Sequence, residues 1–175
     1  MSINNVTLKN GYMKELGTSR ELPFELLVGG GEELKYSTQT GRQSLSINSH
    51  DNQDSIIHIS AKDGFIYLTT KRLIFITASQ GDINSFSIDL RFADKLQLSH
   101  ELKSPWFGAN FWEFIFFSSN VNGASDGFPT NKYFKGSLKF NDGGLFTFVE
   151  VFNTVLNDNV NNTHIDEELP RYTEY

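Results

Sequence analysis

Histidine is the residue type in this chain best suited to acid–base or metal chemistry, because the sequence contains no cysteine. The absence of cysteine excludes disulfide frameworks, thiolate zinc sites and cysteine nucleophiles. No two histidines have zinc-ligand spacing, and none sits beside an obvious catalytic nucleophile or a carboxylate dyad. They are His50, His58, His100 and His164. We therefore expect no metal, no cofactor and no catalytic residues.

A run of three glycines, Gly29–Gly31, is a candidate for phosphate chemistry. A phosphate loop needs Lys-Ser or Lys-Thr after its glycines, and a Rossmann motif needs a helix there. The sequence after Gly31 meets neither condition. The run is therefore predicted to be a turn or a linker.

The distribution of charge limits the classes of partner. The net charge is −6, and it divides into −2 for residues 1–55, +2 for residues 56–140 and −6 for residues 141–175. Nucleic-acid-binding domains have a much stronger basic excess, so we expect no nucleic-acid partner. No secretory signal or membrane-spanning run is visible, and we expect a cytoplasmic and/or nuclear location.

Most of the chain after residue 55 shows the β-branched, aromatic and alternating pattern of short strands. Lys62–Gly64 is predicted to be a hairpin turn, because glycine accepts a positive φ. Residues 65–69 and 73–77 are apolar on both faces, so these strands should be covered on both sides. The predicted strands are Glu33–Thr38, Ile56–Ile59, Phe65–Thr69, Leu73–Thr77, Ser85–Leu90, Leu96–Leu98, Phe111–Phe117 and Tyr133–Phe140.

The period of the apolar residues changes from that of a strand to that of a helix after Asp142-Gly143-Gly144. The change predicts one amphipathic helix of about three turns. Its apolar residues are Leu145, Phe148, Val149, Phe152, Val155 and Leu156. Polar composition predicts loops at Thr40–Asp54 and Ser118–Thr130.

These elements predict a mainly β fold with one C-terminal α-helix. About seven short antiparallel strands would form a small barrel, and the helix would close its open end, which is the outline of a pleckstrin-homology-like barrel. The expected organisation is a flexible N-terminal arm at residues 1–20, a folded domain at 21–157 and an acidic tail at 158–175.

Three segments, in this order, resemble a known family. Residues 64–76, GFIYLTTKRLIFI, are similar to the core of GRAM domains. Residues 107–111, FGANF, resemble the FGANY segment of the WW-domain-binding protein 2 family, and residues 140–144, FNDGG, resemble its turn before the closing helix. The similarity covers residues 21–157. It implies a GRAM domain of the pleckstrin-homology superfamily, no enzymatic activity, and an adaptor or transcription coactivator that recruits WW-domain proteins.

The chain departs from this family near its C-terminus. Family members carry a long proline-rich tail with Pro-Pro-x-Tyr motifs, whereas this chain has 4 prolines and the segment Leu169-Pro170-Arg171-Tyr172. In the implied complex, Leu169 and Pro170 occupy the aromatic groove of a WW domain as polyproline II, Tyr172 enters a second pocket and Arg171 points outward. The implied partner is a HECT-type ubiquitin ligase or a transcriptional regulator. The alternative is a chance match in a disordered terminus.

Basic residues in the predicted turns give a second hypothesis. Pleckstrin-homology-like barrels often bind phosphoinositide headgroups, so a phosphoinositide membrane is the alternative partner. Lys62 would lie in one turn, and Lys71 and Arg72 in the next, so that they could converge at the ends of the barrel. The alternative is that these are ordinary solvated residues, because the net charge of +2 for residues 56–140 is modest for holding an anionic membrane.

An aromatic corner surrounds Gly108–Asn110, with Trp106-Phe107 before it and Phe111-Trp112 after it. Most of these rings are expected in the core or capping a strand. Any of these rings that are exposed would indicate a protein contact, because aromatic side chains anchor interfaces. A lipocalin-like ligand cavity is disfavoured, because the strands are too few and the helix would plug one end.

Overall fold

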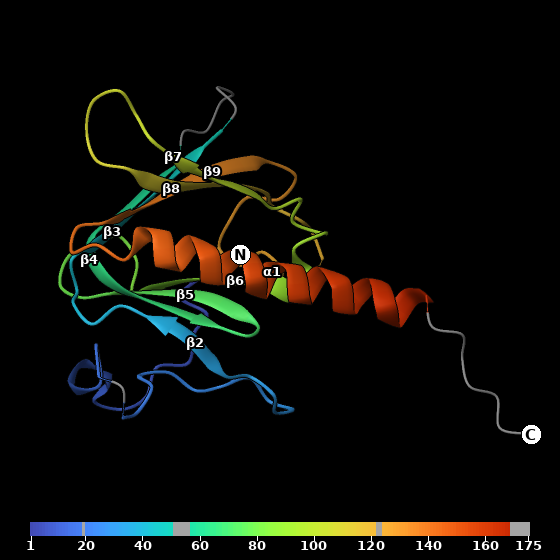
Figure 1. Cartoon of the computed structure of the whole chain (residues 1–175), viewed down its shortest axis with the longest axis horizontal. Helices are drawn as coiled ribbons and strands as arrows, with labels where there is room; N and C mark the ends of the chain where they lie inside the picture. Colours follow the sequence, from blue (N-terminus) through green and yellow to red (C-terminus); the bar gives the residue numbers. More distant parts are fainter. Residues whose placement is uncertain (19, 51–56, 122–123, 169–175) are drawn as a thin grey trace, which may run out of the picture.

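The computed structural model of the chain describes residues 1–18, 20–50, 57–121 and 124–168. Within these residues it contains nine strands, two short 3₁₀ helices and one α-helix (Figure 1). The elements are β1 (Ser2–Ile3), η1 (Tyr12–Lys14), β2 (Leu34–Ser37), β3 (Gln43–Ser49), β4 (His58–Thr69), β5 (Arg72–Thr77), β6 (Ser85–Asp89), η2 (Leu90–Phe92), β7 (Ser99–Lys103), β8 (Phe111–Phe117), β9 (Tyr133–Phe140) and α1 (Leu145–Glu168).

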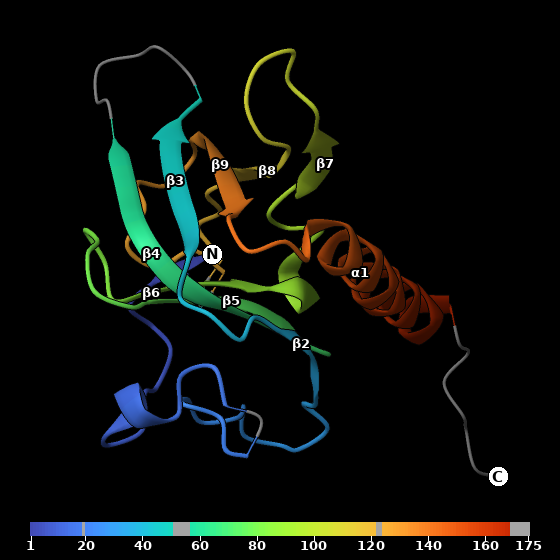
Figure 2. The same ribbon diagram turned by 60° about the vertical axis from the view of Figure 1, so that its left-hand side comes forward.

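The predicted fold class is confirmed: an antiparallel sheet is followed by a C-terminal helix. The strand order is β1-β6-β5-β4-β3-β9-β8-β7, and β2 pairs with β4. In the described part of the chain the end strands β1 and β7 are not paired with each other, so the sheet curls without closing. Helix α1 packs against β2, β8 and η2 and covers one side of the curled sheet (Figure 2). No described helix has both the length and the apolar composition needed to cross a membrane.

Aromatic rings from the sheet and the helix form the main core. Trp112 of β8 is fully buried, and its ring centroid lies 5.2 Å from that of Phe148 and 4.7 Å from that of Phe152 on α1. On β9, Phe134 and Leu138 are buried and belong to the same core. The many phenylalanines of the sequence thus fill the space between the sheet and its helix.

A second, smaller core lies on the other face of β4 and β5. Here Tyr67, Ile74 and Ile76 pack against Val6 and Phe24. The residues predicted as an N-terminal arm therefore lie against the sheet, and β1 pairs with β6. The prediction that both faces of these two strands are covered is confirmed.

Strand β3 lies where the sequence predicted a loop, so the loop at Thr40–Asp54 is wrong. The strand joins the two halves of the sheet, because it pairs with both β4 and β9. Gln43, Leu45 and Ile47 are buried, while the intervening serines stay half-buried. The prediction failed because only two of the seven residues are aliphatic. The predicted strand Leu96–Leu98 is likewise wrong, since the strand in this region is β7.

The hairpin predicted at Lys62–Gly64 is also wrong, because β4 runs unbroken through it. Gly64 has no positive φ. Packing requires a glycine at this position, since a Cβ there would lie 2.2 Å from Cζ of Phe75.

The Asp63 carboxylate accepts hydrogen bonds from the backbone amides of Ser79 and Gln80 and so holds the β5–β6 loop.

Helix α1 is longer than the predicted three turns. Its 24 residues span about 36 Å. The side-chain amide of Asn159 donates to the carbonyls of Thr70 and Val155, at 2.9 Å each, and this contact fixes the helix against the β4–β5 turn. Residues 158–168, predicted as part of an acidic tail, are therefore helical.

Candidate functional site

A buried ion pair joins the start of β5 to the segment before β2. Arg72 donates from Nη2 to Oε1 of Glu32 and from Nε to Oε2, both at 2.7 Å. The Glu32 side chain has no exposed area and that of Arg72 is 8% exposed. The guanidinium also donates to the carbonyl of Glu25 at 3.0 Å and lies over the Phe24 ring.

Glu32 is satisfied by further donors. The backbone amide of Leu27 donates to Oε1 at 3.1 Å, and the hydroxyl of Thr69 donates to Oε2 at 2.9 Å. Burial alone would raise the pKa of Glu32, but the hydrogen bonds from Arg72, Leu27 and Thr69 and the guanidinium charge together hold that pKa below its ordinary value of 4.5. The carboxylate is therefore charged at neutral pH.

This network fixes the loop at residues 26–31, which we call the glycine loop. Gly29, Gly30 and Gly31 have φ values of 109°, 75° and 83°, which side chains rarely adopt. The carbonyl of Gly31 accepts from the Thr70 hydroxyl at 3.1 Å, and the carbonyl of Gly30 accepts from Nζ of Lys71 at 2.9 Å. The glycine loop is thus tied to the β4–β5 turn.

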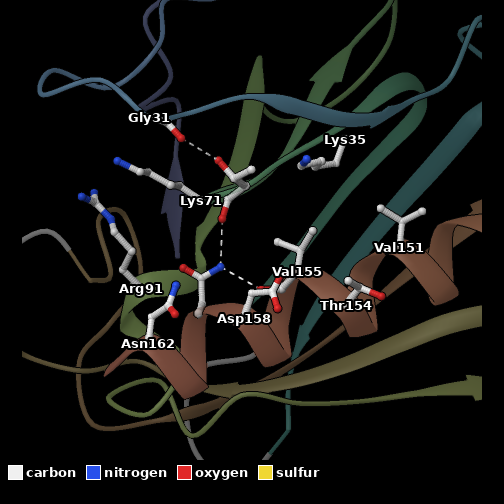
Figure 3. A pocket seen from close by; sticks show the side chains of 11 residues that line it. Gly31, Lys35, Lys71, Arg91, Val151, Thr154, Val155, Asp158 and Asn162 are labelled. Carbon is white, nitrogen blue, oxygen red and sulfur yellow. Dashed lines mark hydrogen bonds between the residues drawn. The ribbon is translucent and has the colours of Figure 1, made fainter. Parts of the chain in front are cut away.

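A cleft of about 610 Å³ opens between this turn and helix α1 (Figure 3). Three basic side chains line it, and each comes from a different element: Lys35 from β2, Lys71 from the β4–β5 turn and Arg91 from η2. In Figure 3, Lys71 and Arg91 extend toward the same side of the cleft. Helix α1 supplies a polar wall that includes Thr154, Asp158, Asn159 and Asn162.

The three cations differ in their partners. Arg91 is paired with Asp89 at 2.7 Å, and this hydrogen bond raises the pKa of Arg91 above its ordinary value. Lys35 lies 3.8 Å from Glu33 in an exposed pair, a type that contributes little. Lys71 has the carbonyl of Gly30 as its partner and no salt bridge to a described carboxylate. Its charge is therefore the most available of the three.

The structure separates the three basic residues predicted to converge. Lys71 lines the cleft, whereas Arg72 lies beneath it in the buried ion pair. Lys62 is exposed within β4, seven residues before Thr69 and therefore about 23 Å away along the strand. The sequence did not predict Lys35 and Arg91 as site residues, because their approach to the cleft depends on how β2 and η2 pack. The segment Leu169–Tyr172 lies outside the described residues.

Among the described side chains, no histidine lines the cleft. His50 and His58 are exposed, and His164 lies on α1. His100 is half-buried, accepts a hydrogen bond from Nε1 of Trp112 at 3.3 Å and packs edge-on against Phe152. Burial lowers the pKa of His100 below 6.5. Within the described ranges no group of histidine and carboxylate side chains is arranged to hold a metal ion.

The aromatic corner divides into buried and exposed parts. Trp112 belongs to the core, whereas Trp106 and Phe107, in the loop between β7 and β8, are 92% and 86% exposed. This loop and the glycine loop lie at opposite ends of the molecule in Figures 1 and 2. The exposed pair is therefore separate from the cleft.

No protein-family model matches the chain, and no curated protein matches it. Among solved structures, the Vps36 N-terminal PH domain matches with a TM-score of 0.51 and 19% identity, covering 89% of this chain and 93% of that one. A chain in the 8S snRNP assembly intermediate matches with a TM-score of 0.42 and 12% identity, covering 81% and 88%. The chain thus has a pleckstrin-homology-like fold. Membership of the WW-domain-binding protein 2 family stays a prediction.

Substitution of Arg72 tests the buried pair. Arg72→Leu leaves the Glu32 carboxylate buried without its cation, so the free energy of unfolding should fall by about 3–5 kcal/mol in urea denaturation. Adding Glu32→Leu should restore much of this loss. Because the pKa of Glu32 is lowered in the folded state, the wild-type contribution should be complete above about pH 4.5 and lost as the pH falls below it.

The matched control is Arg91→Leu, which breaks a pair whose arginine side chain is 46% exposed. This substitution should lower the free energy of unfolding by no more than about 1 kcal/mol. Equal losses for Arg72→Leu and Arg91→Leu would contradict the structural role of the buried pair.

Proposed function

We propose that this domain binds the phosphate-bearing headgroup of a membrane phosphoinositide in the cleft between the β4–β5 turn and helix α1. The observation that carries the proposal is that Lys35, Lys71 and Arg91, from three separate elements, line one cleft. The pleckstrin-homology-like fold supports it at the level of the class of domain. The function is binding, and no catalytic step is involved.

The chemistry of the cleft suits a phosphorylated sugar ring. Its volume of about 610 Å³ lies within the range of small-molecule sites. Lys71 supplies a point charge for a phosphate, and Arg91 keeps guanidinium donors beyond those it uses on Asp89. Thr154 and Asn162, on the wall formed by α1, carry hydroxyl and amide groups that match ring hydroxyls.

Charge reversal in the cleft tests the binding site. Lys71→Glu should weaken binding to phosphatidylcholine vesicles that contain a phosphoinositide by at least tenfold, because a charge-assisted hydrogen bond of about 1.5–3 kcal/mol is replaced by repulsion. Vesicle co-sedimentation measures the loss. Lys62→Glu is the matched control, since it makes the same charge change about 23 Å away along β4. Equal binding by wild type and Lys71→Glu would refute the site.

We propose adaptor activity as a second function, in which Leu169-Pro170-Arg171-Tyr172 is presented to a WW domain of a HECT-type ubiquitin ligase or a transcriptional regulator. The observation that favours it is the length of α1. The helix extends beyond the sheet, and its last residue, Glu168, directly precedes the motif (Figure 1). WW domains bind such segments because a preset polyproline II backbone reduces the ordering cost.

A single substitution tests the motif. Tyr172→Ala should reduce binding of the chain to an isolated WW domain to background in fluorescence or calorimetric titration, because the tyrosine pocket is left empty. Thr173→Ala is the neighbouring control and should bind as the wild type does. Absence of binding by the wild type, or equal binding by Tyr172→Ala, would remove the WW-domain adaptor function.

A further inference from the structure

The glycine loop exposes apolar side chains beside the basic cleft. Val28 is fully exposed and Leu26 is 47% exposed, although both belong to the most apolar stretch of this segment, Leu26-Leu27-Val28. Full exposure of a valine is unfavourable in water, and burying it would gain free energy in proportion to its apolar area. An isolated exposed residue is ordinary, so its meaning here depends on what surrounds it.

The position of Val28 is fixed relative to the cleft. The amide of Leu27 is bound to Glu32, and Nζ of Lys71 is bound to the carbonyl of Gly30. Gly31, which directly precedes Glu32 of the ion pair, lines the cleft itself. Val28 is therefore held between two anchored points, two residues from the carbonyl that contacts the cleft lysine.

This combination of chemistries matches the surface of an anionic bilayer. The phosphates of a bilayer lie at the level of the headgroups, and the apolar phase begins a few ångströms below them. A protein that binds a phosphate and the apolar phase together therefore needs a cationic cleft with an apolar projection beside it. Lys71 and Val28 supply this pair within one loop–turn unit. A soluble anion would use the cleft and leave Val28 in water. The adjacent charge complementarity therefore favours a membrane as the occupant.

We infer that the glycine loop inserts Val28, and Leu26 with it, into the interfacial region of the membrane while the cleft holds a phosphoinositide phosphate. This inference rests on the proposed lipid function. It adds that recognition has two parts, one for the headgroup and one for the bilayer. The three glycines have a role in this arrangement, because they let the chain form a narrow projection with no further side chains at its end.

The experiment compares two probes on the full chain: a soluble inositol polyphosphate, and phosphatidylcholine vesicles that contain the corresponding phosphoinositide. Val28→Asp should lower vesicle affinity about tenfold, because one buried valine side chain is lost, and should leave the affinity for the soluble probe unchanged. Lys71→Glu should lower both affinities. Met13→Asp is the matched control, since Met13 is 55% exposed on η1, outside the glycine loop in sequence, and does not line the cleft.

A gain-of-signal variant gives a direct readout of insertion. Val28→Trp should bind vesicles more tightly than the wild type, and its emission should shift to the blue when vesicles are added but not when the soluble probe is added.

The outcomes test the loop insertion and the headgroup site separately. If Lys71→Glu weakens vesicle binding while Val28→Asp does not, the loop insertion is overturned and the headgroup site stands. If Lys71→Glu changes neither affinity, the headgroup site itself is overturned. Equal weakening of both probes by Val28→Asp, or equal vesicle loss in Met13→Asp, overturns insertion as well, because the effect would then arise from the cleft or from added charge alone.

Discussion

The buried pair of Glu32 and Arg72 fixes the part of the molecule on which the candidate site depends. Removing two charges from water costs several kcal/mol for each ion, and this cost is offset only where geometry is bidentate and the remaining hydrogen-bonding groups are satisfied. Both conditions hold, because Arg72 uses two nitrogens on the carboxylate and Thr69 and Leu27 donate to the same oxygens. A lysine would lack this fork of donors.

The pair acts where three separate segments meet. It joins Glu32, which follows the glycine loop, to Arg72, the first residue of β5. The adjacent β4–β5 turn accepts a hydrogen bond from the side-chain amide of Asn159 on helix α1. The cleft is the space that remains between these anchored parts. Its three cations line one cleft because β2, η2 and the β4–β5 turn are each held by backbone pairing or packing. A rigid cationic cleft loses less entropy on binding an anion than a mobile surface cluster would.

Short β-branched, aromatic and alternating runs predicted the sheet, and the change to a helical period predicted the closing helix. Apolar residues on both faces predicted the double cover of β4 and β5. Prediction failed where a tertiary contact decides the local structure. Gly64 was assigned to a turn, but it is a glycine because the Phe75 ring occupies the place of a side chain. Arg72 was grouped with Lys71 by adjacency, yet Lys71 lies in the β4–β5 turn and lines the cleft, whereas Arg72 begins β5 and is buried against Glu32. Lys35 and Arg91 have no local signal at all.

The molecule thus has surfaces of different character at separate places: the cleft with its glycine loop, and the exposed Trp106–Phe107 loop at the other end. The claim that the cleft is the ligand site is tested most directly by amide NMR during titration of the ¹⁵N-labelled chain with a soluble inositol polyphosphate. The largest shift changes should occur at Gly31, Thr70 and Lys71. Largest changes around Lys62 and Asp82, near the other end of β4, would contradict the account.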